Sequence, residues 1–430
     1  MLYPMKFLPL YKDKIWGGNK IKDLGFNYAP LPNCGELWAL SAVEGNESII
    51  ANGFLAENSL AEALEIYMGE LIGEANYDRF GNQFPLLIKV IDANDRLSIQ
   101  VHPDDTLAQQ RGMDMGKTEM WYILQAEEGS TIVDGFTAKV TPEEYQNLLA
   151  QGKLEDILHV EHPQQGDVFF IPAGRVHALG KGLLLAEIQQ TSDCTYRIYD
   201  YNRRDAQGNL RQLHTAEALD AIDFSPLADG KTHYNYRDNA TVPLAECPYF
   251  TTNLLSLTEP MRKDFASLDS FVVYLCTEGV ATVECLDTRV SIHAGECVLV
   301  PAVADTVDIY GQGAKLLEVY VDPELYDGEL RHRSEISWLE RFIGEADPDD
   351  YDIEDFDEYD DFDDNDDDND NDNDNDNCGC GHHHHEDGCG CGHHHHEDDC
   401  GCGHHHHEDD CGCGHHHHHD HCGCGHHHDN

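Results

Sequence analysis

The chain has 430 residues and a formal net charge of −55. After Phe342 come 30 of the 82 acidic residues and none of the 27 basic ones, which leaves 52 acidic residues upstream and a net charge there of about −25. A field of this sign repels nucleic acids and anionic membranes, and an anionic ligand would need locally placed cations. No run of 18 apolar residues and no apolar signal segment occurs, so we expect a cytoplasmic protein that binds neither nucleic acid nor membrane.

Short apolar segments predict a mainly β fold. They are rich in aromatic and branched side chains and are mostly bounded by Gly, Asn or Asp, as strands require. The clearest are residues 84–93, 120–126, 167–173 and 183–190, and a second series follows between residues 271 and 321. Closely spaced strands with glycine-containing turns favour a sandwich or a closed barrel.

Helical patterns interrupt the strands at a few places. The pattern that begins at Thr141 has Pro142 in its first turn and Glu144 three residues after the threonine, which is typical of a capping box. The helices that we expect are residues 58–73, 141–158, 215–224 and Ser334–Gly344. Near residue 240 the helical pattern gives way to the second strand series, which predicts a domain boundary there.

The last part of the chain, residues 345–430, has a different composition. An acidic Asp/Asn tract is followed by five units that open with CGCG and continue with histidines, beginning at Cys378 and repeating every eleven residues. With so few apolar residues this tail cannot offset its ordering entropy by burial, so we expect it to be disordered without metal. Thiolates beside imidazoles are ligands of Zn, Ni and Cu, which predicts additional labile metal sites within residues 378–428. A low-complexity run without a selected role is the alternative.

The strongest local motif is GDVFFIPAGRVHAL, residues 166–179. It predicts a strand that ends in a Pro172–Gly174 turn, after which the next strand presents His177 at the mouth of a barrel. A single histidine in such a place is more often a structural, hydrogen-bonded side chain than a ligand. Whether His177 is a ligand or a structural residue therefore depends on which other side chains converge at that place.

Two further motifs supply partners for this histidine. In SIQVHPDD, Gln100 and His102 are two residues apart on a strand and so point to the same face. In KTEMWYIL, Glu119 begins another strand and Lys117 precedes it on the same side. With His177 these give two imidazoles, one carboxylate and one amide oxygen, a ligand set that predicts a zinc-type site with open positions.

These motifs, together with the early WGG and GELWALS segments and TYRIYDYNR, resemble type I phosphomannose isomerase in its compact bacterial form, over roughly residues 3–325. The resemblance implies an aldose–ketose isomerase that interconverts mannose 6-phosphate and fructose 6-phosphate through a zinc-assisted enediol mechanism. It implies one catalytic zinc ion. The zinc ligands that it implies are Gln100, His102, Glu119 and His177. It also implies a catalytic Arg197, a substrate site of Ser98, Lys117 and Arg197, and Glu187 and Asp193 as candidate acid/base residues.

The fold that follows from this resemblance has two cupin-type (jelly-roll) β-barrels with inserted helices. We expect a catalytic domain at residues 1–240, a metal-free second domain with a short helix at 241–344 and the tail at 345–430. The second strand series repeats the Gly–Pro spacing of the first, but Val303 replaces the turn glycine and no histidine follows. His293 lies outside the ligand position and is expected to be structural.

Two other classes of function remain as alternatives. A metal-handling or sugar-sensing protein would reuse the same fold without catalysis, although none of the expected ligands or cations is missing. An iron-dependent cupin dioxygenase is disfavoured because Gln100 stands where the usual His-x-His pair has its first histidine.

Overall fold

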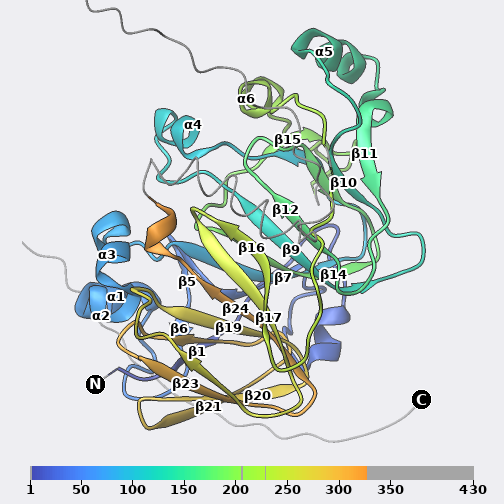
Figure 1. The fold of residues 1–430 in the computed structure, drawn as a ribbon. Coiled ribbons are helices and arrows are strands. Elements are labelled where there is room, and N and C mark those ends of the chain that lie inside the picture. Colours follow the sequence, from blue (N-terminus) through green and yellow to red (C-terminus); the bar gives the residue numbers. More distant parts are fainter. Residues whose placement is uncertain (1, 205–206, 228, 327–430) are drawn as a thin grey trace, which may run out of the picture. The chain divides into compact units, whose positions relative to one another are not determined.

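Antiparallel β-strands form most of the structure, a computed structural model that describes residues 2–204, 207–227 and 229–326 (Figure 1). The mainly β prediction is confirmed. The tail and the helix expected at Ser334–Gly344 lie outside the described residues. No helix in the described ranges combines the length and the apolar character that crossing a membrane requires.

Two sheets of the first half pack face to face. The six-stranded sheet has the order β12 (Val168–Ile171), β9 (Glu119–Ala126), β14 (Leu183–Gln190), β7 (Leu86–Ala93), β3 (Glu36–Leu40) and β2 (Leu10–Lys12). The five-stranded sheet has the order β11 (Leu158–Glu161), β10 (Ile132–Phe136), β13 (His177–Leu179), β8 (Ile99–Val101) and β15 (Tyr196–Tyr199). One apolar cluster joins them, with Ile91 and Trp121 from the first sheet against Ile132 and Leu179 from the second.

The second half repeats this arrangement. Its seven-stranded sheet has the order β16 (Thr241–Cys247), β17 (Phe250–Leu257), β24 (Ala314–Tyr320), β19 (Val272–Glu278), β22 (Cys297–Val300), β1 (Met5–Leu8) and β6 (Ile49–Ile50). Its four-stranded sheet has the order β18 (Met261–Asp264), β23 (Thr306–Tyr310), β20 (Val280–Cys285) and β21 (Thr288–His293). Two strands from the start of the chain thus complete a sheet whose other strands follow residue 240. A two-stranded hairpin is formed by β4 (Ala42–Val43) and β5 (Asn46–Glu47).

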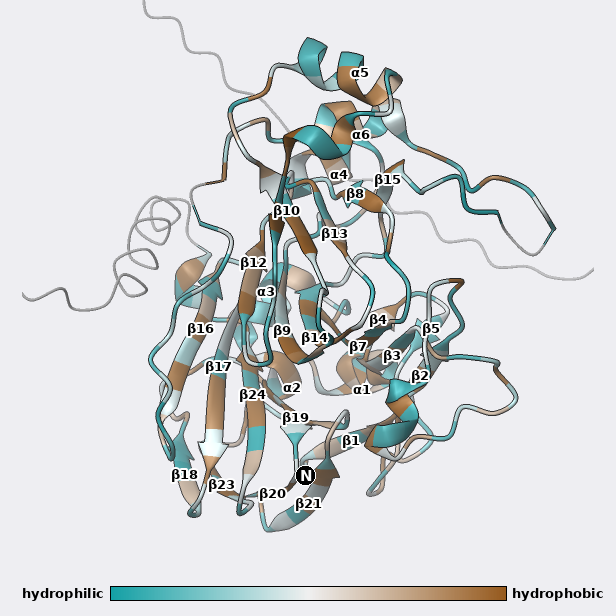
Figure 2. Cartoon of the chain, turned by 90° about the vertical axis from the view of Figure 1, so that its right-hand side faces the viewer, coloured by the Kyte–Doolittle hydropathy of each residue, from teal (hydrophilic) through white to brown (hydrophobic). Residues whose placement is uncertain are grey.

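The largest apolar cluster lies between the six-stranded and the seven-stranded sheets. Leu86 and Met120 contribute to it from one sheet, and Val273 and Leu317 from the other. Strands β7, β14 and β17 are buried at every position because both of their faces are covered. Much of these sheets is accordingly apolar, as the brown colouring shows (Figure 2), but all three strands also bury polar side chains, such as Lys89, Glu187 and Asn253.

The helices are short and only partly where the sequence predicts them. The expected helix at 58–73 is divided into α1 (Leu60–Tyr67) and α2 (Gly69–Ile72), because Met68 between them has a positive φ of 48°. The capping box of Thr141 and Glu144 is present and starts α5 (Pro142–Ala150). The extension of this helix to residue 158 was wrong, because Gly152 adopts a φ of 68° and the chain continues as the 3-10 helix η2 (Leu154–Ile157).

The expected helix at 215–224 is α6 (Thr215–Ala221), and it is shorter than predicted. The remaining helical elements, which the sequence analysis did not predict, are η1 (Lys20–Leu24), α3 (Glu74–Phe80), α4 (Asp105–Gln110) and η3 (Pro323–Leu325). Most of these have only four to seven residues, too few to show a clear helical period. None of these short elements forms an apolar cluster of its own that is as large as the clusters between the sheets.

One aromatic pair allows the central core to be tested. Phe84 and Phe271, which lie just before β7 and β19, are fully buried and their ring centroids lie 4.6 Å apart. We expect Phe84→Ala to lower the free energy of unfolding by about 3–5 kcal/mol, because the cavity would open where both halves share their core. The measurement is urea-induced unfolding followed by tryptophan fluorescence. Phe54→Ala, at a ring that is 61% exposed, is the control and should change stability by less than about 1 kcal/mol.

Candidate metal centre and substrate cavity

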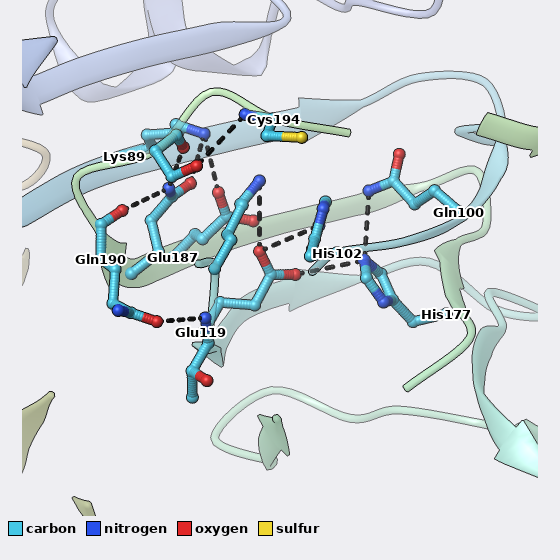
Figure 3. A network of polar contacts seen from close by, with 12 residues as sticks. Lys89, Gln100, His102, Glu119, His177, Glu187, Gln190 and Cys194 are labelled. Carbon is cyan, nitrogen blue, oxygen red and sulfur yellow. Dashed lines mark hydrogen bonds and ion pairs between the residues drawn. The ribbon is translucent and has the colours of Figure 1, made fainter. Parts of the chain in front are cut away.

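Three buried side chains from the five-stranded and six-stranded sheets converge. One potential ligand atom from each of His102, Glu119 and His177 lies within 4.8 Å of the other two (Figure 3). His177 begins β13 and is paired in register with Gln100 of β8, so that His102 follows on the same face. Glu119 begins β9 in the facing sheet. In the described ranges no other group of three such residues comes this close together.

Gln100 adjoins this group through its amide. Its Nε2 lies 3.2 Å from Nε2 of His177, and its Oε1 lies 3.4 Å from the hydroxyl of Ser98. Because the two ends of a carboxamide have nearly the same shape, rotation of the amide would bring the oxygen toward the same point. All four residues that were predicted as ligands therefore lie together.

The polar atoms at the centre of this group lack ordinary hydrogen-bond partners. Both ring nitrogens of His102 and both oxygens of Glu119 are buried without a hydrogen bond. The nearest oppositely charged or ionisable atoms, Nε2 of His102, Nε2 of His177 and Nζ of Lys117, lie 3.5, 3.4 and 3.3 Å from Glu119 oxygens. Unpartnered buried polar atoms are costly, and a divalent cation at this point would satisfy them together. The donor set thus fits a zinc ion.

The protonation states of the two histidines also favour metal binding. Burial lowers the pKa of His177 to about 4 and that of His102 well below its usual range, with Lys117 also disfavouring a charge on each ring. Both imidazoles are therefore neutral near pH 7, which is the form that binds metals. The Nδ1 atom of His177 lies 2.8 Å from the carbonyl oxygen of Arg175, so Nε2 is the atom that points to the group.

A second polar centre lies beside the first, on the neighbouring strands. Lys89 of β7 and Glu187 of β14 are partners in register, and Nζ of Lys89 lies 2.9 Å from Oε1 of Glu187. Trp121 donates its indole N–H to Oε2 of the same glutamate at 3.1 Å. Burial alone would raise the pKa of Glu187, but Lys89 and Lys117 lower it below its usual value, so that the carboxyl is ionised.

A cavity of about 260 Å³ opens between these strands. Six residues that were singled out from the sequence line it, namely Ser98, Gln100, Lys117, Glu187, Asp193 and Arg197. The group of His102, Glu119 and His177, called the metal-type group below, borders this cavity through its neighbours Gln100 and Lys117. The structure thus brings every predicted site residue to the cavity or to the group beside it.

Four charged residues of the cavity wall were missed by the sequence analysis, namely Lys14, Glu36, Lys89 and Arg211. Of these four, only Lys89 could have been found from the sequence, because a lysine within the apolar run LLIKVI must be buried with a partner. Glu36 accepts a hydrogen bond from Nε1 of Trp38 at 2.8 Å and pairs with Lys14 at 3.1 Å. Burial raises the pKa of Glu36, but Lys89 and Lys14 outweigh it and bring the pKa to about 2.

The second half carries no comparable group among the described side chains. His293 packs its ring against Phe26 with centroids 5.2 Å apart, and its Nε2 lies 3.3 Å from Glu296. Both contacts are structural, in agreement with the expectation for this histidine.

Comparison with known proteins relates this site to a family. The model of the type I phosphomannose isomerase catalytic domain matches residues 5–147. The mannose-6-phosphate isomerase ManA of Bacillus subtilis is 38% identical over 258 residues, which cover 59% of this chain and 80% of ManA. The chain belongs to the mannose-6-phosphate isomerase family. A member from Streptococcus mutans is 36% identical over 63% of this chain and 84% of its own length.

Solved structures of this family share the fold. The crystal structure of the Bacillus subtilis mannose 6-phosphate isomerase aligns with a TM-score of 0.66 and 32% identity, covering 74% of this chain and 99% of that one. A mannosephosphate isomerase structure from Archaeoglobus fulgidus, described as putative, aligns at 21% identity with a TM-score of 0.60, which supports the fold alone. Both matches leave about a quarter of this chain unaligned.

The lowered pKa of Glu36 predicts how stability depends on pH. The pKa is about 2 in the folded chain against an ordinary value of 4.5. The contribution of Glu36 to the free energy of unfolding is therefore complete above about pH 5 and is lost as the pH falls toward 2. Glu36→Gln should therefore lower the free energy of unfolding by roughly 2–4 kcal/mol at pH 7. The deficit relative to the unsubstituted chain should shrink between pH 5 and pH 3.

Urea unfolding at several pH values measures this difference. Glu65→Gln, at an exposed position of α1, serves as the matched control and should follow the unsubstituted chain throughout. A deficit for Glu36→Gln that stays constant with pH would contradict the prediction.

Proposed function

We propose that this chain is an aldose–ketose isomerase that interconverts mannose 6-phosphate and fructose 6-phosphate. The observation that carries the proposal is the group of His102, Glu119 and His177 beside a cavity lined by Lys117 and Arg197. Family membership supports it, because the relatives from Bacillus subtilis and Streptococcus mutans bear this activity in their names. A sugar phosphate needs cations that the acidic chain as a whole does not offer, and this cavity has them.

We propose Gln100, His102, Glu119 and His177 as the ligands of one catalytic zinc ion. The unpartnered buried atoms of His102 and Glu119 support this assignment. When bound, zinc supplies Lewis acidity toward the substrate oxygens that gain negative charge in the reaction. Lys117, whose Nζ lies 3.3 Å from Glu119, holds a compensating positive charge at this end of the cavity.

The isomerisation moves a proton between C1 and C2, which requires a group that accepts and returns it. Glu187 and Asp193 both line the cavity and are the candidates. Glu187 is buried and held by Lys89 and Trp121, so its carboxylate is fixed in orientation. Asp193 is exposed and free to approach a bound sugar from the open side. Substitution of each in turn would separate their roles.

The substrate site that we propose contains Ser98, Lys117 and Arg197. All three line the cavity, and Arg197 is anchored because its Nη1 donates to the carbonyl oxygen of Gln212 at 2.8 Å. We assign Arg197 to the phosphate because a guanidinium group can donate two parallel hydrogen bonds to it. Since Lys117 is paired with Glu119, it lies toward the reacting end of the sugar.

We further propose that the two pairs of sheets are the cupin-type barrels expected from the sequence. The catalytic domain is then residues 1–240 and the metal-free domain 241–344, with β1 and β6 of the first completing a sheet of the second. The cysteines of the described residues are free thiols, which supports the cytoplasmic location that we propose.

Removing a ligand tests the role of the metal. We expect His177→Ala to lower kcat/KM for mannose 6-phosphate by about 1000-fold or more, because the charge stabilisation at the reacting oxygens is lost. Zinc content, measured by mass spectrometry on a chain without residues 346–430, should fall from about one ion per molecule to a small fraction of that. Turnover is measured by coupled detection of fructose 6-phosphate.

His293→Ala removes an imidazole from the second half and is the control, with unchanged zinc content and activity. Full turnover by a His177→Ala protein that holds no zinc would exclude the metal from the reaction. One bound zinc ion in the unsubstituted chain without any turnover would instead favour the sugar-sensing alternative.

A second function is proposed for the tail. Histidine and cysteine recur together in each CGCG unit, which supports binding of additional Zn, Ni or Cu ions within residues 378–428. These residues lie outside the described structure. We propose that they buffer zinc for the catalytic site.

Deletion of residues 346–430 tests this proposal. The shortened chain should have unchanged activity in excess zinc but should lose activity at a lower concentration of a competing chelator, because its local supply of zinc is gone. Activity is measured across a chelator titration for both chains. Equal sensitivity of the two would show that the tail does not supply the site.

A further inference from the structure

The lysines and the arginines of the cavity differ in how their charges are compensated. Each of its lysines has a carboxylate partner, since Lys14 lies 3.1 Å from Glu36, Lys89 lies 2.9 Å from Glu187 and Lys117 lies 3.3 Å from Glu119. These pairs leave the lysines with no excess of positive charge. An anionic substrate group would gain little from electrostatic attraction to them.

The cavity is also lined by Arg197 and Arg211. Among the described side chains here, the carboxylate of Asp200 is in contact with Arg211 at 3.2 Å and also with the guanidinium group of Arg203. Asp200 is buried, with 3% of its surface exposed, so it is committed to these two arginines. Arg203 and Arg211 therefore share one carboxylate, and Arg197 has no ion pair among the described side chains, so the three guanidinium groups exceed the carboxylates that they contact by two positive charges.

The backbone fixes the two cavity arginines close to each other. The N–H of His214 donates to the carbonyl oxygen of Arg197 at 2.8 Å, and the N–H of Arg197 donates to Nδ1 of His214 at 3.1 Å. Residues 211–214 thus run along β15, and the side chain of Arg197 reaches the carbonyl of Gln212. Burial and the nearby charge of Arg211 both lower the pKa of Arg197, which reflects the repulsion between the two.

Part of the donor capacity of these arginines is unused. Nε of Arg197 is buried and makes no hydrogen bond, although the group carries a full charge. Two like charges held together in a partly buried place are unfavourable unless an anion lies between them. A phosphate dianion matches the two uncompensated charges, and guanidinium groups bind phosphate through paired hydrogen bonds.

We propose that Arg211 is a second phosphate-binding residue, which together with Arg197 selects phosphorylated over unphosphorylated sugars. Asp200 positions Arg211 and, because it also serves Arg203, leaves the positive charge of Arg211 largely available. The inference rests on the proposed function for the identity of the sugar but not for the binding of phosphate.

Arg211→Gln tests the inference in the full, zinc-loaded chain. We expect KM for mannose 6-phosphate to rise about tenfold or more with kcat changed less than about threefold, as for the loss of a charged hydrogen bond to substrate. The dissociation constant of inorganic phosphate, measured by isothermal titration calorimetry, should rise by a similar factor. Arg211→Lys keeps the positive charge but not the paired N–H donors of the guanidinium group, so it should recover part of the lost phosphate affinity.

Arg204→Gln is the matched control. It removes an equal charge from the same segment, at an exposed arginine whose Nη1 donates to the carbonyl of Gly208 and which does not line the cavity. Its KM and its phosphate affinity should stay within about twofold of the unsubstituted chain. Circular dichroism and thermal unfolding establish that each variant is folded.

The outcomes separate this inference from the proposed function. Equal phosphate affinity in the unsubstituted chain and in folded Arg211→Gln would overturn the role of Arg211, whatever the turnover. The same loss in Arg204→Gln as in Arg211→Gln would also overturn it, because the effect would then be one of net charge. Weakened phosphate binding in Arg211→Gln alone, in a chain that does not convert mannose 6-phosphate, would support the phosphate site and reject the proposed reaction.

Discussion

The buried ion pair between Lys89 and Glu187 is the interaction on which the site depends. Both residues lie on central strands that are covered on both faces, where an isolated charge would be strongly destabilising. Their pairing allows charged groups to line a cavity inside an otherwise apolar fold. Glu36 and Trp38 on β3 extend the same network, and Trp38 lies against the ammonium group of Lys89 at 5.4 Å from its ring centroid.

The same layout occurs in the second half without a metal-type group among its described residues. Glu318 lies on the central strand β24, opposite Asn253 of β17 and Tyr274 of β19, as Glu187 lies between Lys89 and Trp121. Asn253, Tyr274 and Lys263 all bind the carboxylate of Glu318. A central glutamate compensated by its neighbours is thus a shared feature of both halves, and the group of His102, Glu119 and His177 distinguishes the first.

Compensation of charge also differs among the cations of the cavity. Its lysines are matched by carboxylates. Its arginines, together with Arg203, outnumber the carboxylate that they contact. A phosphate group would therefore gain more from the arginines than from the lysines. The strongly acidic chain makes such a local reserve of positive charge necessary.

The sequence by itself determined the β class, the capping box of α5 and the set of Gln100, His102, Glu119 and His177 that the fold brings together. Those inferences depend on short apolar segments, on helix-capping residues and on motifs of a few residues, all of which are local features of the sequence. Only the tertiary structure decided that β1 and β6 join the second half and that Lys14, Glu36 and Arg211 reach the cavity. Strand order and the partner of a buried charge depend on contacts between distant segments, and no local pattern specifies them.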